Sequence, residues 1–380
     1  MNQKVIYLDY NATTPVDQRV LNEMIPYFTE KYGNASSIQH PYGWDAEEAV
    51  DISREKVARL IGAKAHEIVF TSGATEAINL ALFGLVDKNP FKNHIITCET
   101  EHKAMLGACK ELKLRGISVT YLKVDNSGNI NLKELESEIT DQTLLVSIMH
   151  ANNEIGVIHP IEKMAKITHQ CGAFFMTDFT QSVGKIPFDV RKVDLAVMSA
   201  HKIYGPKGIG ALYMKRSANV EIASKVFRRG HERGYLSGTL NVPGIVGFGK
   251  ACELCQDEMN VDSDRLGKLR DALESELNQL EGTQINSSDK RLPHMTNISF
   301  YDIDGSKLLP SLRGLAVSQG SACTSSTLEP SHVLKAVGLS DDLAFSSLRI
   351  GLGRFTTEDE IEQTAQIIKN AVARLRIQPS

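Results

Sequence analysis

Short runs of β-branched and other apolar residues alternate with longer amphipathic stretches between about residues 66 and 214. The short runs read EIVFT, HIITCE, ISVTYLKV, TLLVSIMH, AFFMTD, DLAVMS and IGALYM, and the stretches between them include GATEAINLALFGLV, HKAMLGACKELK and PIEKMAKITHQ. This alternation is typical of βαβ units, so we predict an α/β fold with a mostly parallel seven-stranded sheet and helices on both faces. Sites in such sheets form at the carboxyl ends of the strands.

A second pattern starts near Val242, where a helical periodicity continues to about residue 280, with a break expected at residues 261–264. New strands (NISFYD and SLRIGLG) and new helices (GSKLLPSLRG and a closing helix after Thr357) follow it. They predict a second, smaller α/β domain with a boundary near residue 260. The expected division is a large domain of residues 16–259 and a small domain of residues 1–15 and 260–380.

Composition and charge narrow the class of protein. The 380 residues have a mass of 41.9 kDa, with 42% apolar and 23% charged residues, which is ordinary for a soluble globular enzyme. A net charge of -4 and a pI near 6.3 give no basic surface for nucleic acid or an anionic membrane. The start, MNQKVIYLDYNATTPVD, lacks the tracts of a signal peptide, and no apolar run approaches the roughly 18 residues of a membrane span. We expect a cytoplasmic protein with small-molecule or protein partners.

The 6 cysteines are scattered along the chain, which is a poor disulfide framework and suits a reducing compartment. Cys252 and Cys255 form a CxxC that is compatible with half a metal site or a redox pair. The surrounding VGFGKACELCQDEM has a helical pattern, and no second ligand pair lies at zinc-like spacing. We therefore expect these two side chains to pack in a helix, and we expect no metal.

A lysine, Lys202, follows the strand DLAVMS together with Ser199 and His201, ahead of a Gly/Pro-rich turn. Partial burial at the end of a strand lowers the pKa of a lysine and makes its amine nucleophilic, so Lys202 is suited to forming a Schiff base. A plain turn lysine fits this segment equally well.

Two further segments favour the chemical interpretation. The strand AFFMTD ends in Asp178, an acid within an apolar run, which needs a cationic partner. The protonated pyridine nitrogen of pyridoxal phosphate is such a partner. In VFTSGATEAINLAL, a strand leads through Ala74 and Thr75 into a helix, whose N-terminal N–H groups suit a phosphate. A capped helix after a turn is the alternative for that segment alone.

The segment SQGSACTSSTLEPS, residues 318–331, surrounds Cys323 with glycine, serine and threonine. A structural cysteine normally has apolar neighbours, which this one lacks. Such a composition keeps the backbone flexible, and six or seven residues at ~3.3 Å each allow an excursion of roughly 20 Å. The segment therefore predicts a mobile loop that moves a reactive thiol.

Taken together, these motifs resemble the cysteine desulfurases of the class V, fold type I pyridoxal-phosphate superfamily. The resemblance runs almost end to end, through YLDYNATTPVD, YGNASSIQHPYG, EIVFTSGATEAINLAL, TEHKA, SIMHANNEIGVI, TDFTQSVGK, SAHKIYGPKGIGALY, GHERGYLSGTLNV, GSACTSSTLEPS and SSLRIGLGRFTTEDEI. The long loop around Cys323 is similar to that of the branch serving general iron–sulfur assembly and tRNA thiolation.

The resemblance implies roles for individual residues around pyridoxal 5′-phosphate. Lys202 would hold the cofactor covalently and later move the Cα proton of the substrate. Asp178 would pair with the pyridine nitrogen, Gln181 would bond the phenolic oxygen, and His102 would stack on the ring and act as acid or base. The phosphate would be bound by Ala74, Thr75, Ser199 and His201, joined by Thr239 of a second subunit, so that the site would exist only in a homodimer.

Asn153 and Arg349 look like the pair that receives the substrate carboxylate. Arg349 lies in an apolar strand, where an unpaired guanidinium is costly, so a bidentate carboxylate ligand explains it. An internal salt bridge is the alternative for Arg349, and a turn-forming asparagine is the alternative for Asn153.

The implied reaction takes sulfur from L-cysteine, leaving L-alanine and a persulfide on Cys323 for an iron–sulfur scaffold protein or other acceptors. The thiolate of Cys323 would be the attacking nucleophile. Two other interpretations stay open: a different class V activity, such as a selenocysteine lyase or an aminotransferase, and a catalytically idle sulfur-relay or scaffold protein.

The chain departs from the family pattern at Phe179, where a small residue is usual. Side chains alternate along a strand, so we expect Thr180 rather than Phe179 to share the face of Asp178. Phe179 should then pack behind the sheet.

Overall fold

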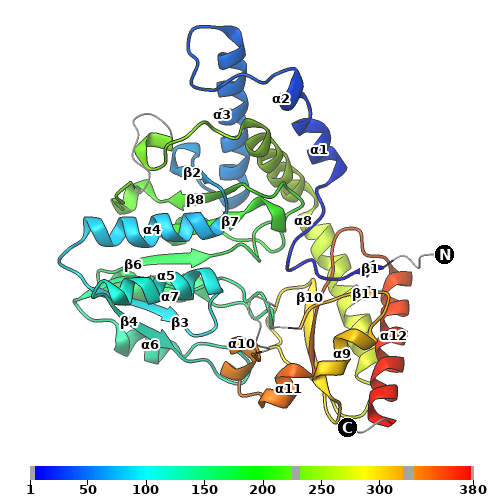
Figure 1. The fold of residues 1–380 in the computed structure, drawn as a ribbon. Helices are drawn as coiled ribbons and strands as arrows, with labels where there is room; N and C mark the ends of the chain where they lie inside the picture. Colours follow the sequence, from blue (N-terminus) through cyan, green and yellow to red (C-terminus); the bar gives the residue numbers. More distant parts are fainter. Residues whose placement is uncertain (1–4, 225–231, 320–328, 378–380) are drawn as a thin grey trace.

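The computed structural model describes residues 5–224, 232–319 and 329–377 (Figure 1). Its main sheet has seven strands in the order β2-β8-β7-β6-β5-β3-β4. These strands are β2 (Ile68–Thr71), β3 (His94–Cys98), β4 (Ser118–Leu122), β5 (Thr143–Ser147), β6 (Phe174–Asp178), β7 (Leu195–Ser199) and β8 (Gly210–Met214). The predicted fold class is confirmed.

One strand runs against the others. β8 is antiparallel to both of its neighbours, β2 and β7, while the remaining pairs are parallel. The connection from β7 to β8 contains no crossover helix, and such a direct return joins antiparallel strands. Each strand boundary lies within a few residues of the apolar run that predicted it.

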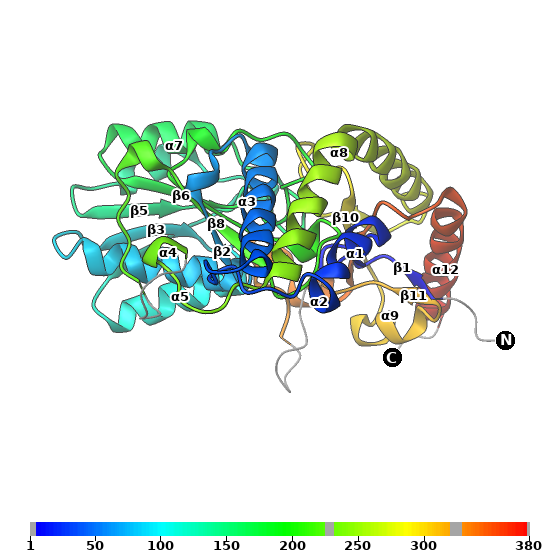
Figure 2. The ribbon, with the colours of Figure 1, turned by 90° about the horizontal axis from the view of Figure 1, so that it is seen from above.

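Helices cover both faces of this sheet, so its strands other than the edge strand β4 are buried on both sides, and their sequences are mostly apolar runs. α4 (Ala74–Lys88) and α5 (Lys103–Leu114) share one apolar cluster. α3 (Pro41–Ile61), α7 (Ile161–Gln170) and the first half of α8 (Val242–Leu277) share the other, and Figure 2 shows α7 and α5 on opposite sides of the sheet. The smaller helices of this part are α1 (Gln18–Met24), α2 (Pro26–Thr29) and α6 (Leu132–Glu138).

The C-terminal part surrounds a third apolar cluster, which includes Ile6 and Leu8 from the other end of the chain. β1 (Ile6–Tyr7) pairs in parallel with β11 (Leu315–Ala316), and an antiparallel sheet has the order β12-β10-β9. Its strands are β9 (Thr283–Ile285), β10 (Met295–Phe300) and β12 (Ser347–Gly351). The helices are α9 (Gly305–Ser311), α10 (His332–Ala336), α11 (Asp341–Phe345) and α12 (Glu358–Ile377). The expected division of the chain into two domains stays a prediction.

The expected break at residues 261–264 is wrong. α8 continues unbroken through this stretch and connects the first and third clusters (Figure 1). The stretch contains β-branched and short polar residues of low helix propensity but neither glycine nor proline, and Asp262 is held by Arg354 at 2.8 Å. Tertiary contacts therefore override the weak local preference.

Cys252 and Cys255 are buried in α8 within the first cluster, so the predicted helix packing of the CxxC is confirmed. Among the described residues, no helix has both the length and the apolar content that crossing a bilayer requires.

Candidate active site

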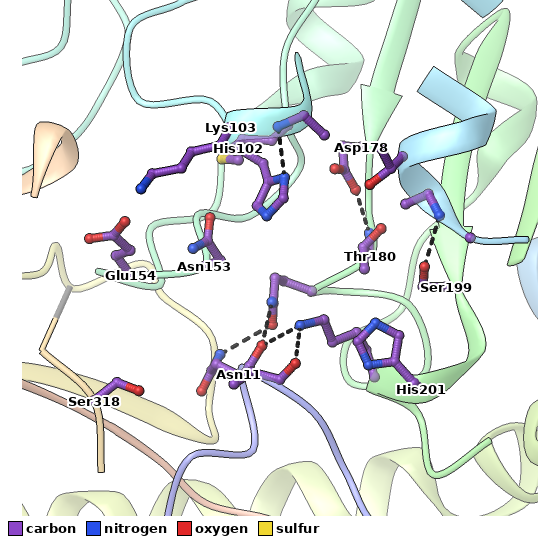
Figure 3. Close-up of a pocket in the computed structure, with 18 of the residues that line it drawn as sticks. Asn11, His102, Lys103, Asn153, Glu154, Asp178, Thr180, Ser199, His201 and Ser318 are labelled. Carbon is purple, nitrogen blue, oxygen red and sulfur yellow. Dashed lines mark hydrogen bonds between the residues drawn. The ribbon is translucent and has the colours of Figure 1, made fainter. Parts of the chain in front are cut away.

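A cavity of about 850 Å³ lies at the carboxyl ends of the strands, between the main sheet, the N-terminal segment and the C-terminal part (Figure 3). Most of the residues expected at the site line it: Ala74, Thr75, His102, Asn153, Asp178, Gln181, Ser199, His201, Lys202 and Arg349. Thr239 is exposed and does not line this cavity. Cys323 lies outside the described residues, as does most of the predicted loop at residues 318–331.

Lys202 ends a short 3₁₀ turn, Ala200–Lys202, that directly follows β7. Its Nζ atom donates hydrogen bonds to the backbone oxygens of Asn11 and Ala12, each at 2.6 Å. Burial lowers the pKa of this amine to about 8, and the positive charge of Arg349 lowers it further. A substantial part of the Lys202 population is therefore neutral and nucleophilic near physiological pH.

Asp178, the last residue of β6, is only 8% exposed, and its Oδ1 atom accepts a hydrogen bond from the Thr180 N–H at 2.9 Å. Thr180 lines the cavity, and its buried Oγ1 atom has no partner among the described residues. Phe179 is buried in the core, with its ring centroid 5.4 Å from that of Phe188. The prediction that Thr180 shares the face of Asp178 while Phe179 packs behind the sheet is confirmed.

The N-terminus of α4 meets the end of β7 at a very close approach. The Ala74 N–H donates to Ser199 Oγ at 2.9 Å, and Gly73 has a φ of 156°. A Cβ atom on Gly210 would lie 2.7 Å from the Gly73 Cα atom, so only glycine fits there. The Ser72 N–H donates a hydrogen bond to a carboxylate oxygen, Glu76 Oε2, at 2.6 Å. The positive end of α4 thus lies at the wall of the cavity, where an anion is favoured.

Two histidines of the cavity have defined partners on one ring nitrogen. His102 is the N-cap of α5, where its Nδ1 atom accepts the Ala104 N–H at 3.1 Å. That acceptor role places the proton of the neutral ring on Nε2. The Nδ1 atom of His201 lies 3.1 Å from Thr13 Oγ1. Burial lowers the pKa of both rings, that of His201 to about 4, so both are neutral at pH 7.

Arg349 lies in β12 and lines the cavity. Its Nη2 atom is 2.8 Å from Asp9 Oδ1, and its Nη1 atom donates to the backbone oxygen of Asn153 at 3.3 Å. The salt bridge considered as an alternative is thus present. The Nε atom of Arg349 is nevertheless buried without a partner among the described residues, so Asp9 does not satisfy the whole guanidinium.

Asn11 and Asp9 also line the cavity, although they are not among the site residues that the sequence predicted. The backbone oxygen of Asn11 accepts from Lys202 and, at 3.0 Å, from Gln181 Nε2, while its Nδ2 atom donates to Gln181 Oε1 at 3.2 Å (Figure 3). Asn11 therefore holds both ends of the Gln181 amide. The available signal was the polar segment YLDYNATTP directly after an apolar pair, but nothing local shows that it reaches the strands 190 residues away.

Glu101 was also missed, although it precedes His102 in TEHKA. It is 1% exposed, its Oε1 atom accepts the Met149 N–H at 2.5 Å, and its Oε2 atom has no partner among the described residues. Burial raises the pKa of this carboxyl well above its ordinary value, which favours the neutral form of the acid beside His102.

Comparison with known proteins gives a consistent result. The model of the family described as Aminotransferase class-V matches residues 6–364. "Cysteine desulfurase IscS" of Anaeromyxobacter sp. (strain Fw109-5) is 51% identical over 376 residues, covering 98% of this chain and 93% of the relative. "Cysteine desulfurase IscS" of Pasteurella multocida (strain Pm70) is 52% identical over 377 residues, with the same shares covered.

Solved structures are similar over nearly the whole chain. A "NIFS-LIKE PROTEIN" superposes with a TM-score of 0.91 at 40% identity, covering 98% of this chain and 100% of the other. A structure titled "SspA in complex with cysteine" superposes with a TM-score of 0.82 at 36% identity, covering 93% and 100%.

Proposed function

Because the chain belongs to the aminotransferase class-V family and is similar over nearly its full length to cysteine desulfurases, we infer that it is a cysteine desulfurase. It removes sulfur from L-cysteine and releases L-alanine. The single observation that carries the reaction is Lys202, an amine of lowered pKa that lines the same cavity as the buried acid Asp178.

We propose pyridoxal 5′-phosphate as the cofactor, since the described residues fit its three functional parts. Lys202 would bind the aldehyde, Asp178 the ring nitrogen, and the N-terminus of α4 the phosphate. The unpartnered Thr180 Oγ1, which lines the cavity, supports a ligand in this space. When bound, this cofactor supplies an electron sink for the pair left behind by the Cα proton.

The chain itself has four tasks in this proposal. The amine of Lys202 takes the Cα proton and returns it, which its lowered pKa permits near pH 8. Arg349 binds the substrate carboxylate through its free Nε edge, while Asp9 fixes the orientation of the guanidinium. His102 offers its Nε2 proton to the reacting groups, and Asn11 holds Gln181 in place through two hydrogen bonds.

The sulfur acceptor in this proposal is Cys323. Its thiolate attacks the sulfur of the substrate, an S–S bond forms, the substrate C–S bond breaks, and the electron pair returned to carbon takes up a proton to give alanine. Ser318, five residues before Cys323, lines the cavity and is paired with Arg349 through two backbone hydrogen bonds of 2.7 and 3.3 Å. Five residues span at most ~17 Å, so Cys323 is within reach of the cavity.

Both described ends of the segment that carries Cys323 are fixed to the protein. Gln319 Nε2 donates to the backbone oxygens of Gly305 and Phe345 at 2.9 and 2.8 Å. At the other end, Ser331 caps α10 and bonds the buried Glu154 carboxylate. Gln319 and Glu154 both line the cavity, so these contacts hold the two described ends beside it.

We further propose a homodimer, in which Thr239 of the partner subunit completes the phosphate site. The exposure of Thr239 in the single chain supports this arrangement. An iron–sulfur scaffold protein and proteins of tRNA thiolation are the proposed acceptors of the persulfide sulfur.

The test is an assay of the purified protein with L-cysteine and a reductant, in which alanine and sulfide should appear in equal amounts. Release of a keto acid instead of sulfide would indicate an aminotransferase. Cys323→Ser should keep the cofactor absorbance and lose sulfide release, whereas Lys202→Ala should lose the absorbance of the covalently bound cofactor. Full sulfide release by the serine variant would refute the assigned nucleophile.

A further inference from the structure

A second cavity, of about 620 Å³, lies outside the active site, where the chain leaves β5 and enters α7. It is lined by two histidines, two lysines and an aromatic ring: His150, His159, Lys163, Lys290 and Phe188. None of these residues has a part in the proposed reaction.

His159 is the most unusual group of this cavity. It is 1% exposed, and neither of its ring nitrogens has a hydrogen-bond partner among the described residues. A buried donor and a buried acceptor that stay unpaired destabilise the folded protein. Asp125 is the acid whose charge acts on the His159 ring, but its oxygens already accept hydrogen bonds from Asn129 and Ser127. The described residues therefore supply no hydrogen-bond partner for this imidazole.

The charges around the cavity favour an anion. α7, a helix of 10 residues, begins at Ile161 with its positive end in the cavity, and Lys163 and Lys290 are exposed on its walls. One of the two lining acids, Asp189, is already bound by Arg191 at 2.8 Å. The other acid, Glu162, is exposed in the first turn of α7. The uncompensated charge is positive.

The remaining wall is aromatic and packs against Phe179, the residue that follows Asp178 and departs from the family pattern. The Phe188 ring centroid lies 4.7 Å from that of His150 and 5.4 Å from that of Phe179. The backbone N–H of His150 donates to the Asp178 backbone oxygen at 2.8 Å, and the ring Nδ1 atom of His150 lies 2.8 Å from Ser182 Oγ. The cavity thus lies directly behind the strand end that carries Asp178, with an apolar surface beside the cationic one.

We propose that this cavity binds a small molecule bearing a phosphate or carboxylate group, whose oxygens accept a hydrogen bond from His159 and pair with Lys163 and Lys290. Burial lowers the pKa of both histidines to about 4, so each ring is neutral at pH 7 and offers one N–H. Phe188 and the ring of His150 would contact the apolar part of the ligand.

Isothermal titration calorimetry of the cofactor-loaded enzyme tests this site, because the loaded cofactor occupies the phosphate site of α4. Inorganic phosphate and acetate are titrated separately at pH 7. Saturable binding of phosphate, of acetate or of both supports the site when His159→Leu weakens it, and it then identifies the class of the ligand. Binding that His159→Leu leaves unchanged overturns the assignment. Absence of saturable heat with both probes overturns the proposal. The measurement does not depend on turnover of L-cysteine, so it stands apart from the proposed function.

Three variants locate the binding. His159→Leu should weaken it about tenfold or more, as expected for a lost hydrogen bond to a charged group. Because the imidazole has no partner, this change leaves no new unpaired group in the fold. The double change Lys163→Ala with Lys290→Ala alters only exposed side chains and should weaken binding about two- to fivefold. Lys166→Ala, exposed on the same helix but outside the cavity, should have no effect, and equal affinity in all variants would overturn the assignment.

Discussion

The lowered pKa of Lys202 can be measured through the pH dependence with which the proposed cofactor, pyridoxal 5′-phosphate, attaches to the cofactor-free protein. Only the neutral amine attacks the aldehyde, so the rate should rise with pH and level off above about 8, the pKa that burial and Arg349 impose. An ordinary lysine, with a pKa of 10.5, is neutral in about 1 of 3,000 molecules at pH 7. With a pKa of about 8 the neutral fraction is about one tenth, a gain of roughly 300-fold.

The salt bridge beside Lys202 predicts shifts of opposite sign. Arg349 lowers the pKa of Lys202 because it repels the ammonium form, and Asp9 raises it because it attracts that form. Arg349→Gln should therefore move the midpoint of attachment upward, and Asp9→Asn should move it downward, each on the order of one pH unit. Lys103→Ala is the control, because Lys103 lines the same cavity but is not among the causes of the shift at Lys202.

The assay follows the absorbance of pyridoxal 5′-phosphate in a stopped-flow instrument between pH 6 and 10. A wild-type midpoint near 10 would refute the reasoning about burial. Shifts of the same sign in the two salt-bridge variants would refute the electrostatic assignment, even if the wild-type midpoint lies near 8.

Three other predictions concern the stability of the fold. Gly210→Ala should destabilise the protein by about 1–3 kcal/mol and weaken cofactor binding, because the added Cβ atom would lie 2.5 Å from the Met198 oxygen. Gly107→Ala, in an exposed helical position with no atom within 4 Å, should instead stabilise it by about 0.5–1 kcal/mol, as chemical unfolding would show. Lys185 is partly buried, with Nζ 3.1 Å from His294 Nε2, and the burial of its amine lowers its pKa to about 7. Between pH 7 and 10.5 the unfolded state holds more protons at this lysine, so stability should rise with pH by at most about 1.4 kcal/mol per unit. Lys185→Met should lose that rise in urea unfolding at pH 7.5 and 9, and an unchanged slope would contradict the burial argument.

Local patterns predicted the strands and the chemical residues that directly follow them. Lys202 and Asp178 were found because each polar side chain stands at the end of an apolar run, and such ends meet at one edge of a parallel sheet. The same alternation rule placed Thr180 and Phe179 on opposite faces.

Features that depend on distant contacts were not predictable in this way. Asp9 and Asn11 reach the cavity because β1 pairs with β11, and no periodicity near the N-terminus indicates that partner. The antiparallel direction of β8 likewise depends on the path of the chain after Lys202. The continuity of α8 depends in part on the contact between Arg354 and Asp262, which the local sequence does not reveal.

The bridge between Asp9 and Arg349 joins residues that are 340 positions apart. A ribosome adding 5–20 residues per second needs roughly 20 to 70 s to cover that interval. During this time the nascent chain carries Lys202 and its strands without Arg349, the residue proposed to bind the substrate carboxylate. In the proposed mechanism the site is therefore complete only when translation is nearly finished.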